Sequence, residues 1–327
     1  MFDLISIGDA RIDNLVHLPK AHLSCVLNKQ RCEICLNYGD KIPIDDIKSL
    51  PAGNNNNNAI GASRLKLKTA IYGNVGEDSN GKMLLEHLKK EGVDIRYMVV
   101  NKDVATEQSI VIDYQGERTI LVYHYPWEYS LPELDAAKWI YFSSVSYSFS
   151  KTQLIHQIEQ YAKRTGANLV YSPGTHQLNF GVKKFPRLLS LTKLIILNKE
   201  EAKRVLAIDV KKNLEIKKLL TKLSDLGPEM AVITDAKEGS YGFDGRNYYK
   251  LGIFPANLVE MTGAGDAYAT GVLAGLSYGK DLSEAMRWGA ANGAAAVEQI
   301  GPQAGLLTYS QMQNKLKESP KIVVKEI

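Results

Sequence analysis

The stretch Thr262-Gly263-Ala264-Gly265-Asp266-Ala267-Tyr268 is the most informative part of the sequence. Glycine and alanine let the backbone approach a ligand closely, and the small residues that follow predict a helix. The first N–H groups of a helix have no partners inside it and carry the positive end of its dipole, so they favour phosphate. A carboxylate in that first turn, here Asp266, can take a proton from an attacking hydroxyl. The heptad is equally compatible with a glycine-rich turn whose Asp stabilises the helix N-terminus.

Short apolar strands alternate with helices on both sides of this stretch. Apolar runs predict strands at 69–75, 139–143, 169–171, 194–197 and 231–234, and residue periodicity predicts helices at 80–90, 151–164, 199–207, 212–225, 264–278 and 282–298. Strands of this buried type, separated by helices, form βαβ units in which a parallel sheet is covered on both faces. We therefore expect an α/β fold.

Two segments depart from this alternation. Residues 11–50 contain no convincing helix, and residues 102–125 form strand-like runs with a turn at Gln115–Gly116. Both are expected to leave the main sheet and to pair into a small separate sheet, although they lie far apart in the chain. Otherwise residues 1–327 are expected to form a single domain. The only low-complexity tract is the run Asn54–Asn58.

Two further motifs follow predicted strands. Asn198-Lys199-Glu200-Glu201 comes after the strand LIIL, where a Glu can hold Mg²⁺ through water near substrate phosphates. The same spacing also resembles a capping box. The stretch Gly73–Gly81, GNVGEDSNG, is compatible with close approach to a ligand or with a strand-to-helix turn.

A third polar group lies after the first strand. Gly8-Asp9 and Asp13 follow that strand, and Pro51-Ala52-Gly53 and Asn57 come later. Asp and Asn are natural partners of sugar hydroxyls because they offer acceptors and donors at short range. A solvated loop with Asx-turns is the alternative interpretation.

Taken in this order, the motifs resemble those of the ribokinase-like (PfkB) sugar and nucleoside kinases over nearly the whole chain. The shared elements are Gly-Asp…Asp near the N-terminus, Gly53…Asn57…Ala59, Gly-x-Val-Gly-x-Asp-x-x-Gly at 73–81, Asn-x-x-Glu at 198–201, Thr…Gly at 234–239 and Thr-Gly-Ala-Gly-Asp at 262–266. The resemblance implies a ribokinase-like α/β sandwich, with a predominantly parallel central sheet flanked by helices and a small β-sheet lid. The segments at about 11–50 and 102–125 fall where the lid strands would be.

The resemblance also implies roles for the matching residues. Asp266 is similar to the catalytic base, and Gly263, Ala264 and Gly265 are similar to the anion hole for the transferred phosphoryl group. The ATP site would include Asn198, Thr234, Gly239 and Asn292, and Glu201 would hold Mg²⁺ through water. Acceptor contacts would come from Asp13, Gly53 and Asn57, with Arg118 and Tyr123 of the lid as further candidates.

The sequence departs from the family pattern at several places. Glu260 replaces the family's Asp in a region that binds an activating monovalent cation in some members, so K⁺ dependence is left open. Ala236 and Ala52 stand where glycines are usual. The segment Ser143–Ser146 lacks the Glu that some pentose kinases carry there, which argues against ribose.

Composition excludes other classes of protein. The 40 basic and 36 acidic residues give a net charge of +4, too small and scattered to indicate nucleic acid or an anionic membrane as partner. No stretch reaches the roughly 20 apolar residues needed to span a bilayer. The N-terminal MFDLISIGDARID carries three Asp and no basic region, unlike a signal peptide. With only three cysteines, the chain is expected in a reducing, cytoplasmic setting.

All three cysteines fall in one cluster. His22, Cys25, Cys32 and Cys35 have the form His-x₂-Cys-x₆-Cys-x₂-Cys, whose ligands could hold a structural zinc ion. Free thiols on lid strands are the simpler expectation.

The resulting prediction is an ATP-dependent, Mg²⁺-requiring kinase. It would transfer the γ-phosphoryl group to a hydroxymethyl group of a small sugar, fructose-like or 2-keto-3-deoxy-sugar-acid-like. A sugar phosphate is disfavoured, because no clear Lys/Arg cluster is found at the sugar site. A homodimer formed through the lid is a further expectation, since lid sheets of this family often pair.

Three alternatives were weighed. A nucleoside kinase would need an apolar or aromatic slot for the base, which Tyr114, Tyr123, Tyr125 and Trp127 could supply. A non-catalytic sugar or nucleotide sensor would have no need of Asp266. A nicotinamide-dependent dehydrogenase would need Gly-x-Gly-x-x-Gly after the first strand, where this chain has Gly8-Asp9-Ala10-Arg11.

Overall fold

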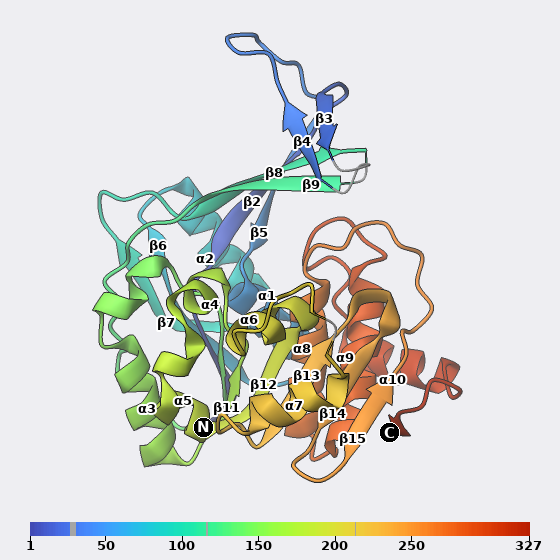
Figure 1. Ribbon diagram of the computed structural model, residues 1–327. Coiled ribbons are helices and arrows are strands. Elements are labelled where there is room, and N and C mark those ends of the chain that lie inside the picture. Colours follow the sequence, from blue (N-terminus) through green and yellow to red (C-terminus); the bar gives the residue numbers. More distant parts are fainter. Residues whose placement is uncertain (27–30, 116, 213) are drawn as a thin grey trace.

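The computed structural model describes residues 1–26, 31–115, 117–212 and 214–327. Ten strands form one large sheet in the order β16-β15-β14-β13-β12-β11-β10-β1-β6-β7 (Figure 1). Their bounds are β1 Phe2–Ile7, β6 Thr69–Gly76, β7 Asp94–Asn101, β10 Ala137–Phe142, β11 Asn168–Tyr171, β12 Thr192–Asn198, β13 Met230–Thr234, β14 Ser240–Phe243, β15 Tyr248–Leu251 and β16 Lys325–Glu326. The strands from β7 to β13 pair in parallel, and β14 to β16 add antiparallel pairs at one edge. The predicted α/β fold with a predominantly parallel sheet is therefore confirmed.

Helices cover both faces of this sheet (Figure 1). The described helices are α1 Asn54–Arg64, α2 Ser79–Lys90, α3 Leu154–Thr165, α4 Thr175–Phe180, α5 Pro186–Leu191, α6 Lys199–Val205, α7 Ile216–Ser224, α8 Ala264–Ser277, α9 Leu282–Ala296 and α10 Tyr309–Glu318. Successive strand residues point to opposite faces. Ile5 accordingly packs in a cluster with α3, α6 and α7, while Leu4 packs with α8 and α9. Both faces are apolar, as expected for a buried parallel sheet.

Helices α8 and α9 pack unusually closely because glycine lies at their contact. A Cβ added to Gly271 of α8 would lie 2.5 Å from the carbonyl oxygen of Trp288 in α9. A Cβ on Gly275 would lie 2.8 Å from Cα of Ala285. The small residues after Asp266 thus serve helix packing as well as the helix N-terminus.

The two segments that depart from the alternation form a small sheet, as predicted. It contains β5 Asp46–Ala52, β2 Arg11–His17, β8 Gln108–Tyr114 and β9 Glu117–Tyr123, paired in that order. The β2–β8 pair is parallel, and the other two pairs are antiparallel. The small sheet stands at one end of the body (Figure 1). None of the described helices is long and apolar enough to cross a membrane.

The six predicted helices are found with shifted ends, and four of the described helices, α1, α4, α5 and α10, were not predicted. The helix expected at 212–225 begins only at Ile216, and the one expected at 151–164 begins at Leu154 after a 3₁₀ turn. Helix α1 was not predicted because five consecutive asparagines are poor helix formers. In the stretch Gly73–Gly81, Asp78 caps α2 by accepting a hydrogen bond from the Gly81 N–H at 2.7 Å. This capping contact fits the strand-to-helix turn.

The cysteine cluster differs from both sequence expectations. Strands β3 His22–Val26 and β4 Arg31–Cys35 form a hairpin in which Cys25 opposes Cys32, and a disulfide joins these two cysteines. His22 opposes Cys35 in the same hairpin. Each lies three residues from a disulfide cysteine on its own strand, and side chains alternate along a strand, so His22 and Cys35 lie on the other face of the hairpin. The four side chains do not share one face, so they cannot form a zinc site together. A disulfide also departs from the reducing setting expected from cysteine usage.

The close α8–α9 contact yields a stability prediction. Gly271→Ala should lower the free energy of unfolding by about 1–3 kcal/mol, because the new methyl group would force the two helices apart. Gly293→Ala in α9 is the matched control, since its Cβ would come no nearer than 3.4 Å to the Ala264 carbonyl oxygen. Urea unfolding of both variants measures the difference. Equal destabilisation of both would contradict the packing argument.

Candidate active site

The carboxyl ends of the parallel strands bring several predicted residues to one edge of the large sheet. Strand β1 lies between β6 and β10, and the chain continues outward on both sides of it. Ligands of open α/β sheets bind outside the carboxyl ends of strands at such a switch point. Asp9 follows β1 and Ser144 follows β10, whereas Asn198 and Thr234 lie opposite each other at the ends of β12 and β13.

Helix α8 starts at this edge with the motif Thr262–Tyr268. Gly263 caps it with φ of 78°, and a Cβ there would lie 2.7 Å from Cα of Pro302. Only glycine satisfies both conditions without strain. A Cβ on Gly265 would meet no atom within 4 Å, so the backbone of this first turn faces open space. The arrangement is that of an anion site at a helix N-terminus.

Asp266 is held by two asparagines from the start of α1. The Asn54 amide donates to Oδ1 at 2.9 Å, and the Asn57 amide donates to Oδ2 at 2.8 Å. Burial raises the pKa of the Asp266 carboxyl, and the two amide hydrogen bonds oppose this rise because they favour the charged form. The carboxylate is therefore oriented at both oxygens, and no cation among the described residues pairs with it.

The other asparagines of the run fix α1 in place. Asn58 donates to Oγ1 of Thr270 in α8 at 3.1 Å, and Asn55 donates to the carbonyl oxygen of Ser144 at 3.3 Å. Asn56 instead donates to the carbonyl oxygen of Ala52 at 3.2 Å, within its own segment. The tract that looked like low complexity in the sequence is thus a set of specific amide contacts between α1, α8 and the loop after β10.

The predicted acceptor residues lie at the base of the small sheet. Asp13 is buried and accepts a hydrogen bond from the Ser109 hydroxyl at 2.5 Å, and its charge contributes to the raised pKa of Asp266. Nε of Arg11 lies 3.8 Å from Asp13. Gly53 has φ of 103°, and a Cβ there would lie 2.8 Å from the Asp9 carbonyl oxygen. The structure thus groups Asp13, Gly53 and Asn57 near Asp266.

Asn198 and Glu201 form a capping box at the start of α6. The Glu201 N–H donates to Asn198 Oδ1 and the Asn198 N–H donates to Glu201 Oε2, each at 2.9 Å. Burial raises the pKa of Glu201, and the charge of Asp266 raises it further. The capping interpretation is therefore correct for the local contacts. A buried carboxyl whose pKa is raised by the charge of a second carboxylate also suits a hard cation with oxygen ligands, so these residues fit a Mg²⁺ ion.

Arg118 links the small sheet to the start of α8. Its guanidinium donates to Oγ1 of Thr262, and the Thr262 hydroxyl donates to Glu260. The other oxygen of Glu260 accepts from the Gly301 N–H at 2.7 Å. Arg118 therefore lies beside the anion site rather than among the acceptor residues. Glu260, the residue that left K⁺ dependence open, already has a partner at each carboxylate oxygen.

Two residues expected at the ATP site have other tasks in the structure. Asn292 is fully buried, donates to the Ala267 carbonyl oxygen at 2.8 Å and accepts from the Leu307 N–H at 3.0 Å. Its amide joins α8 and α9, and the side chain has no exposed surface with which to contact ATP directly. Gly239 has φ of 88°, and a Cβ there would lie 2.0 Å from the Leu251 carbonyl oxygen. This glycine is thus required by the turn itself.

The aromatic residues considered for a base slot are dispersed. Trp127 is buried and donates to Glu107 at 3.0 Å, and Tyr125 packs against its ring. The Tyr114 hydroxyl donates to the Ala21 carbonyl oxygen at 2.9 Å. Tyr123 pairs with Gln108, six residues before Tyr114, so Tyr123 and Tyr114 lie on the same face of the small sheet but at opposite ends of β8. These four side chains do not line one slot.

The sequence did not identify several polar side chains at the site. Asn54 and Ser144 are linked by a 3.0 Å hydrogen bond from the serine hydroxyl, and the strand ends provided the only signal for Ser144. Asp9, Glu107 and His124 lie together, with one side-chain oxygen or nitrogen of each within 4.8 Å of the others. The sequence had singled out Asp9, but Glu107 and His124 come from other segments, so no spacing in the sequence could reveal their contact with it.

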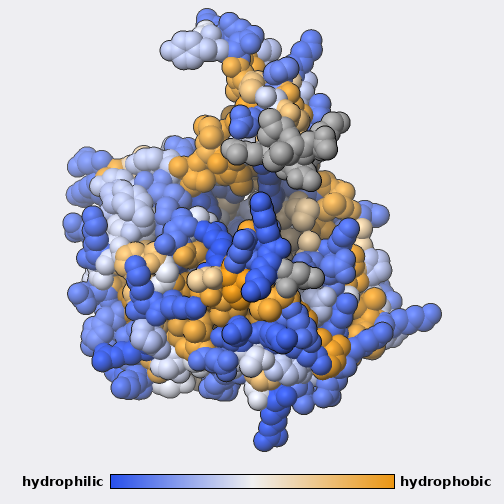
Figure 2. All heavy atoms as spheres, in the orientation of Figure 1, coloured by the Kyte–Doolittle hydropathy of each residue, from blue (hydrophilic) through white to orange (hydrophobic). Residues whose placement is uncertain are grey.

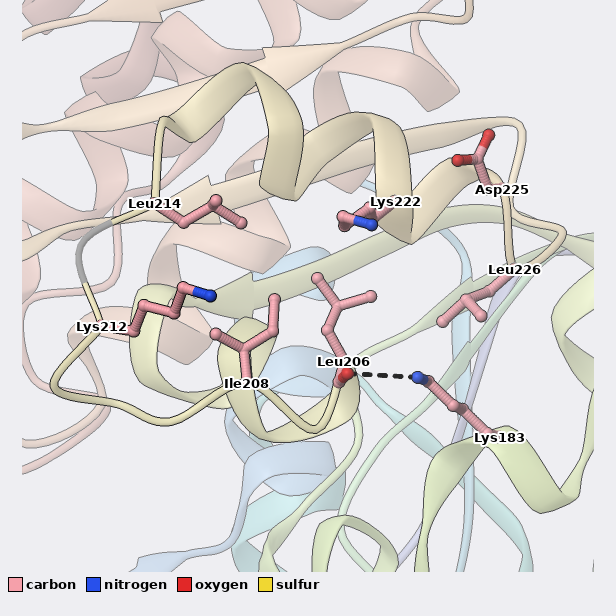
Figure 3. Close-up of a pocket in the computed structure, with 8 residues that line it drawn as sticks. All are labelled: Lys183, Leu206, Ile208, Lys212, Leu214, Lys222, Asp225 and Leu226. Atoms are coloured by element: carbon pink, nitrogen blue, oxygen red, sulfur yellow. Dashed lines mark hydrogen bonds between the residues drawn. The ribbon is translucent and has the colours of Figure 1, made fainter.

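The surface of the molecule is hollowed at the candidate site, and a separate pocket lies elsewhere. The space-filling view is hollowed beneath the small sheet, at the edge where the strands end (Figure 2). The separate pocket lies between the 3₁₀ turn Val182–Lys184, the segment after α6, and α7 (Figure 3). It is lined by Lys183, Leu206, Ile208, Lys212, Leu214, Lys222, Asp225 and Leu226, none of which is a predicted site residue.

Comparisons with known proteins agree with this geometry. Residues 23–308 match the pfkB family carbohydrate kinase. The chain is 28% identical over 282 residues to the ATP-dependent 6-phosphofructokinase of Thermoanaerobacterium thermosaccharolyticum, covering 82% of this chain and 85% of that protein. It is 24% identical over 297 residues to the 5-dehydro-2-deoxygluconokinase of Shouchella clausii, covering 84% and 90%.

A solved structure gives the same result for the fold. The structure of Arabidopsis thaliana ribokinase complexed with ribose and ATP matches this chain with a TM-score of 0.79 at 21% identity. The match covers 97% of this chain and 99% of that one. The fold is therefore ribokinase-like, and the chain is a kinase that belongs to the pfkB family of carbohydrate kinases.

Proposed function

We propose that the protein transfers the γ-phosphoryl group of ATP to a hydroxymethyl group of a small sugar. The observation that carries this proposal is the Asp266 carboxylate, which two asparagine amides hold at the N-terminus of α8. A base and an anion site then lie within one helical turn. Phosphoryl transfer needs the attacking and leaving oxygens in line, with a group that orients the acceptor hydroxyl and groups that stabilise the phosphoryl charge.

Asp266 would act as the general base. The amides of Asn54 and Asn57 occupy one position on each carboxylate oxygen and leave lone pairs free for an acceptor hydroxyl. Burial raises the pKa of the carboxyl, which brings it closer to the working pH and makes it a stronger base than an exposed Asp. As the hydroxyl oxygen attacks the γ-phosphorus, the bond from that phosphorus to the β–γ bridging oxygen would break, ADP would leave, and the hydroxyl proton would pass to Asp266.

The start of α8 would hold the transferred group. The backbone N–H groups of Gly263, Ala264 and Gly265 would stabilise the charge that spreads over the phosphoryl oxygens. Asn198 and Thr234, at adjacent strand ends, would contact the nucleotide. Glu201 would hold Mg²⁺ through water, and the ion would supply charge neutralisation at the phosphates.

The acceptor contacts favour a neutral or singly acidic sugar over a sugar phosphate. Asp13, Asn57 and the backbone at Gly53 offer acceptors and donors for hydroxyl groups. Among the described residues, Arg11 places a cation beside these acceptor residues. Its Nε lies 3.8 Å from Oδ1 of Asp13. The relative named 5-dehydro-2-deoxygluconokinase agrees with this preference, whereas the relative named 6-phosphofructokinase carries a sugar-phosphate acceptor in its name. A fructose-like sugar or a 2-keto-3-deoxy sugar acid remains the first choice, and a nucleoside is the alternative.

A second copy of the chain would cover the outer face of the small sheet. Ile110 and Leu121 lie opposite each other on β8 and β9, and their side chains are 42% and 55% exposed. Apolar side chains gather on this part of the molecule (Figure 2). Exposed apolar patches of this kind favour protein contacts.

The proposed dimer can be tested by size. Leu121→Glu should convert a dimer to a monomer in light scattering, because a charge would be buried at the contact. Leu258→Glu is the matched control, since Leu258 is exposed on a different segment. A wild-type monomer at all concentrations would reject this contact.

The proposed reaction is tested by ADP release with Mg-ATP and a panel of sugars, keto-deoxy sugar acids and nucleosides. Acceptor-dependent turnover is expected with one class, and Asp266→Asn should reduce it by about 10²–10⁴-fold while ATP still binds. Binding of an acceptor without turnover in the wild type would instead favour the non-catalytic sensor. Equal turnover of the variant would exclude Asp266 as the base.

The pH profile tests the contacts around Asp266. Activity should fall as the pH is lowered through the pKa of Asp266, which burial places above the ordinary aspartate value. Asn57→Ala should move this acid limb to higher pH, because it removes a donor that favours the charged carboxylate. Asn56→Ala is the control, since its amide donates to Ala52 and not to Asp266. An unchanged limb in Asn57→Ala would contradict the assignment.

A further inference from the structure

Glu107 and His124 form a hydrogen-bonded pair at the base of the small sheet. Nδ1 of His124 lies 3.1 Å from Oε2 of Glu107. Oε1 of Glu107 accepts from the Tyr125 N–H at 3.1 Å and from Trp127 Nε1 at 3.0 Å. The Glu107 side chain has no exposed surface, so these contacts fix its carboxyl group and, through it, the orientation of the imidazole.

The other imidazole nitrogen is free to meet a ligand. Among the residues that the structure describes, none hydrogen-bonds Nε2 of His124. The side chain is 23% exposed, and its ring contacts the edge of His176 at a centroid distance of 4.6 Å. A buried carboxyl that aligns a partly exposed imidazole is a common way to present one nitrogen to a substrate.

This pair borders the proposed acceptor site. His176 lies in the first turn of α4, and Gly174 is the N-cap residue of that helix. Gly174 packs tightly against Ser144, because a Cβ on Gly174 would lie 2.8 Å from Cα of Ser144. The Ser144 hydroxyl donates to Asn54, which holds Asp266. The charge of Arg11 adds to the effect of burial in lowering the pKa of His124, and it opposes the rise in the pKa of Asp266. Both groups therefore lie within the electrostatic reach of Arg11.

The charged and titratable groups around the pair come from four segments. They are Asp9 after β1, Arg11 on β2, Tyr129 in the loop before β10, and His176 on α4, which itself contacts Tyr147. Burial lowers the pKa of His124, so its ring is neutral near pH 7. Burial raises the pKa of Glu107 to about 7. A metal ion is a weaker interpretation of Asp9, Glu107 and His124, because Tyr129, Trp127 and the Tyr125 N–H already donate to the two carboxyl groups.

The pair has two states that differ by one proton. When Glu107 is ionised, Nδ1–H of His124 donates to it and Nε2 is a hydrogen-bond acceptor. When Glu107 gains a proton, its O–H donates to Nδ1 and the ring proton moves to Nε2, which becomes a donor. Both states keep the ring neutral and keep Nε2 as the free atom.

We propose that Nε2 of His124 hydrogen-bonds a hydroxyl group of the sugar acceptor, and that Glu107 is the residue that positions it. This inference rests on the proposed sugar kinase function and adds the residue that recognises an acceptor hydroxyl away from the reacting one. A hydroxyl serves as donor or acceptor, so it can bond either state of Nε2, with a geometry that changes between them. Acceptor affinity should therefore depend on pH near 7.

The test measures KM and kcat for each sugar of the panel, and KM for ATP, from pH 5.5 to 8.5. His124→Phe keeps a ring and removes both nitrogens, and it should raise the KM of the active sugar about five- to tenfold. The KM for ATP should stay within twofold. A deoxy analogue of that sugar that lacks the bonded hydroxyl should bind the variant and the wild type alike.

Glu107→Gln provides the readout that a structural role would not move. The Tyr125 and Trp127 N–H groups would hold the amide oxygen, so the amide NH₂ would donate to Nδ1 and fix the proton on Nε2. The pH dependence of the acceptor KM near pH 7 should then disappear. Trp127→Phe is the control, since it removes one donor to Glu107 and leaves the His124 contact, and it should lower stability without removing the pH dependence.

Each outcome decides between the proposals. No turnover of the wild type with any sugar would overturn both the proposed function and this inference. Turnover in the wild type with an unchanged acceptor KM in His124→Phe would overturn this inference alone. Equal increases in the KM for ATP and for the sugar would also overturn it, because they would indicate a general loss of structure. If His124→Phe fails to fold, an unchanged pH profile in Glu107→Gln would overturn it as well.

Discussion

The candidate site depends on the pair of amide hydrogen bonds between helix α1 and Asp266. A buried carboxylate without a cation is costly unless its oxygens are hydrogen-bonded. Asn54 and Asn57 provide these bonds and also tie α1 to α8, two helices that lie about 210 residues apart in the chain. Amide donors stabilise the charge without neutralising it, so the carboxyl group keeps its ability to accept a proton. A lysine or arginine in the same place would stabilise the charge more strongly and would make Asp266 a weaker base.

The sheet provides the frame on which this contact is built. Strand β1 ends beside β6 and β10, and the segments that follow β1 and β10 contact α1 through Asn55 and Gly53. The small sheet adds Asp13 from one excursion of the chain, and Glu107 and Arg118 come from the other. Because Arg118 reaches Thr262 while Glu107 reaches His124, the same sheet borders both the anion site and the acceptor side. Movement of this sheet would therefore alter both halves of the site together.

The sequence predicted the fold well and the site in part. Alternating apolar runs and helices are local patterns, so the parallel sheet, six of its described helices and the two segments of the small sheet could be inferred from the sequence. The family was identified from the order of short motifs, above all the one ending at Asp266. Asn54, Ser144, Glu107 and His124 could not be found in this way, because their roles depend on contacts across long stretches of chain. Asn292 shows the opposite case, since a matching position in the sequence proved to be buried between two helices.

The run of asparagines shows most clearly why a sequence pattern can mislead. Five asparagines are unfavourable in a helix, yet each amide here has a specific partner, so tertiary contacts outweigh the local preference. The most direct test of this account is a crystal structure with a non-hydrolysable ATP analogue, Mg²⁺ and the sugar that supports turnover. The account predicts that an acceptor hydroxymethyl oxygen lies within hydrogen-bond distance of Asp266, with the γ-phosphate at the start of α8. A sugar bound with no hydroxyl near Asp266, or a nucleotide bound away from α8, would contradict it.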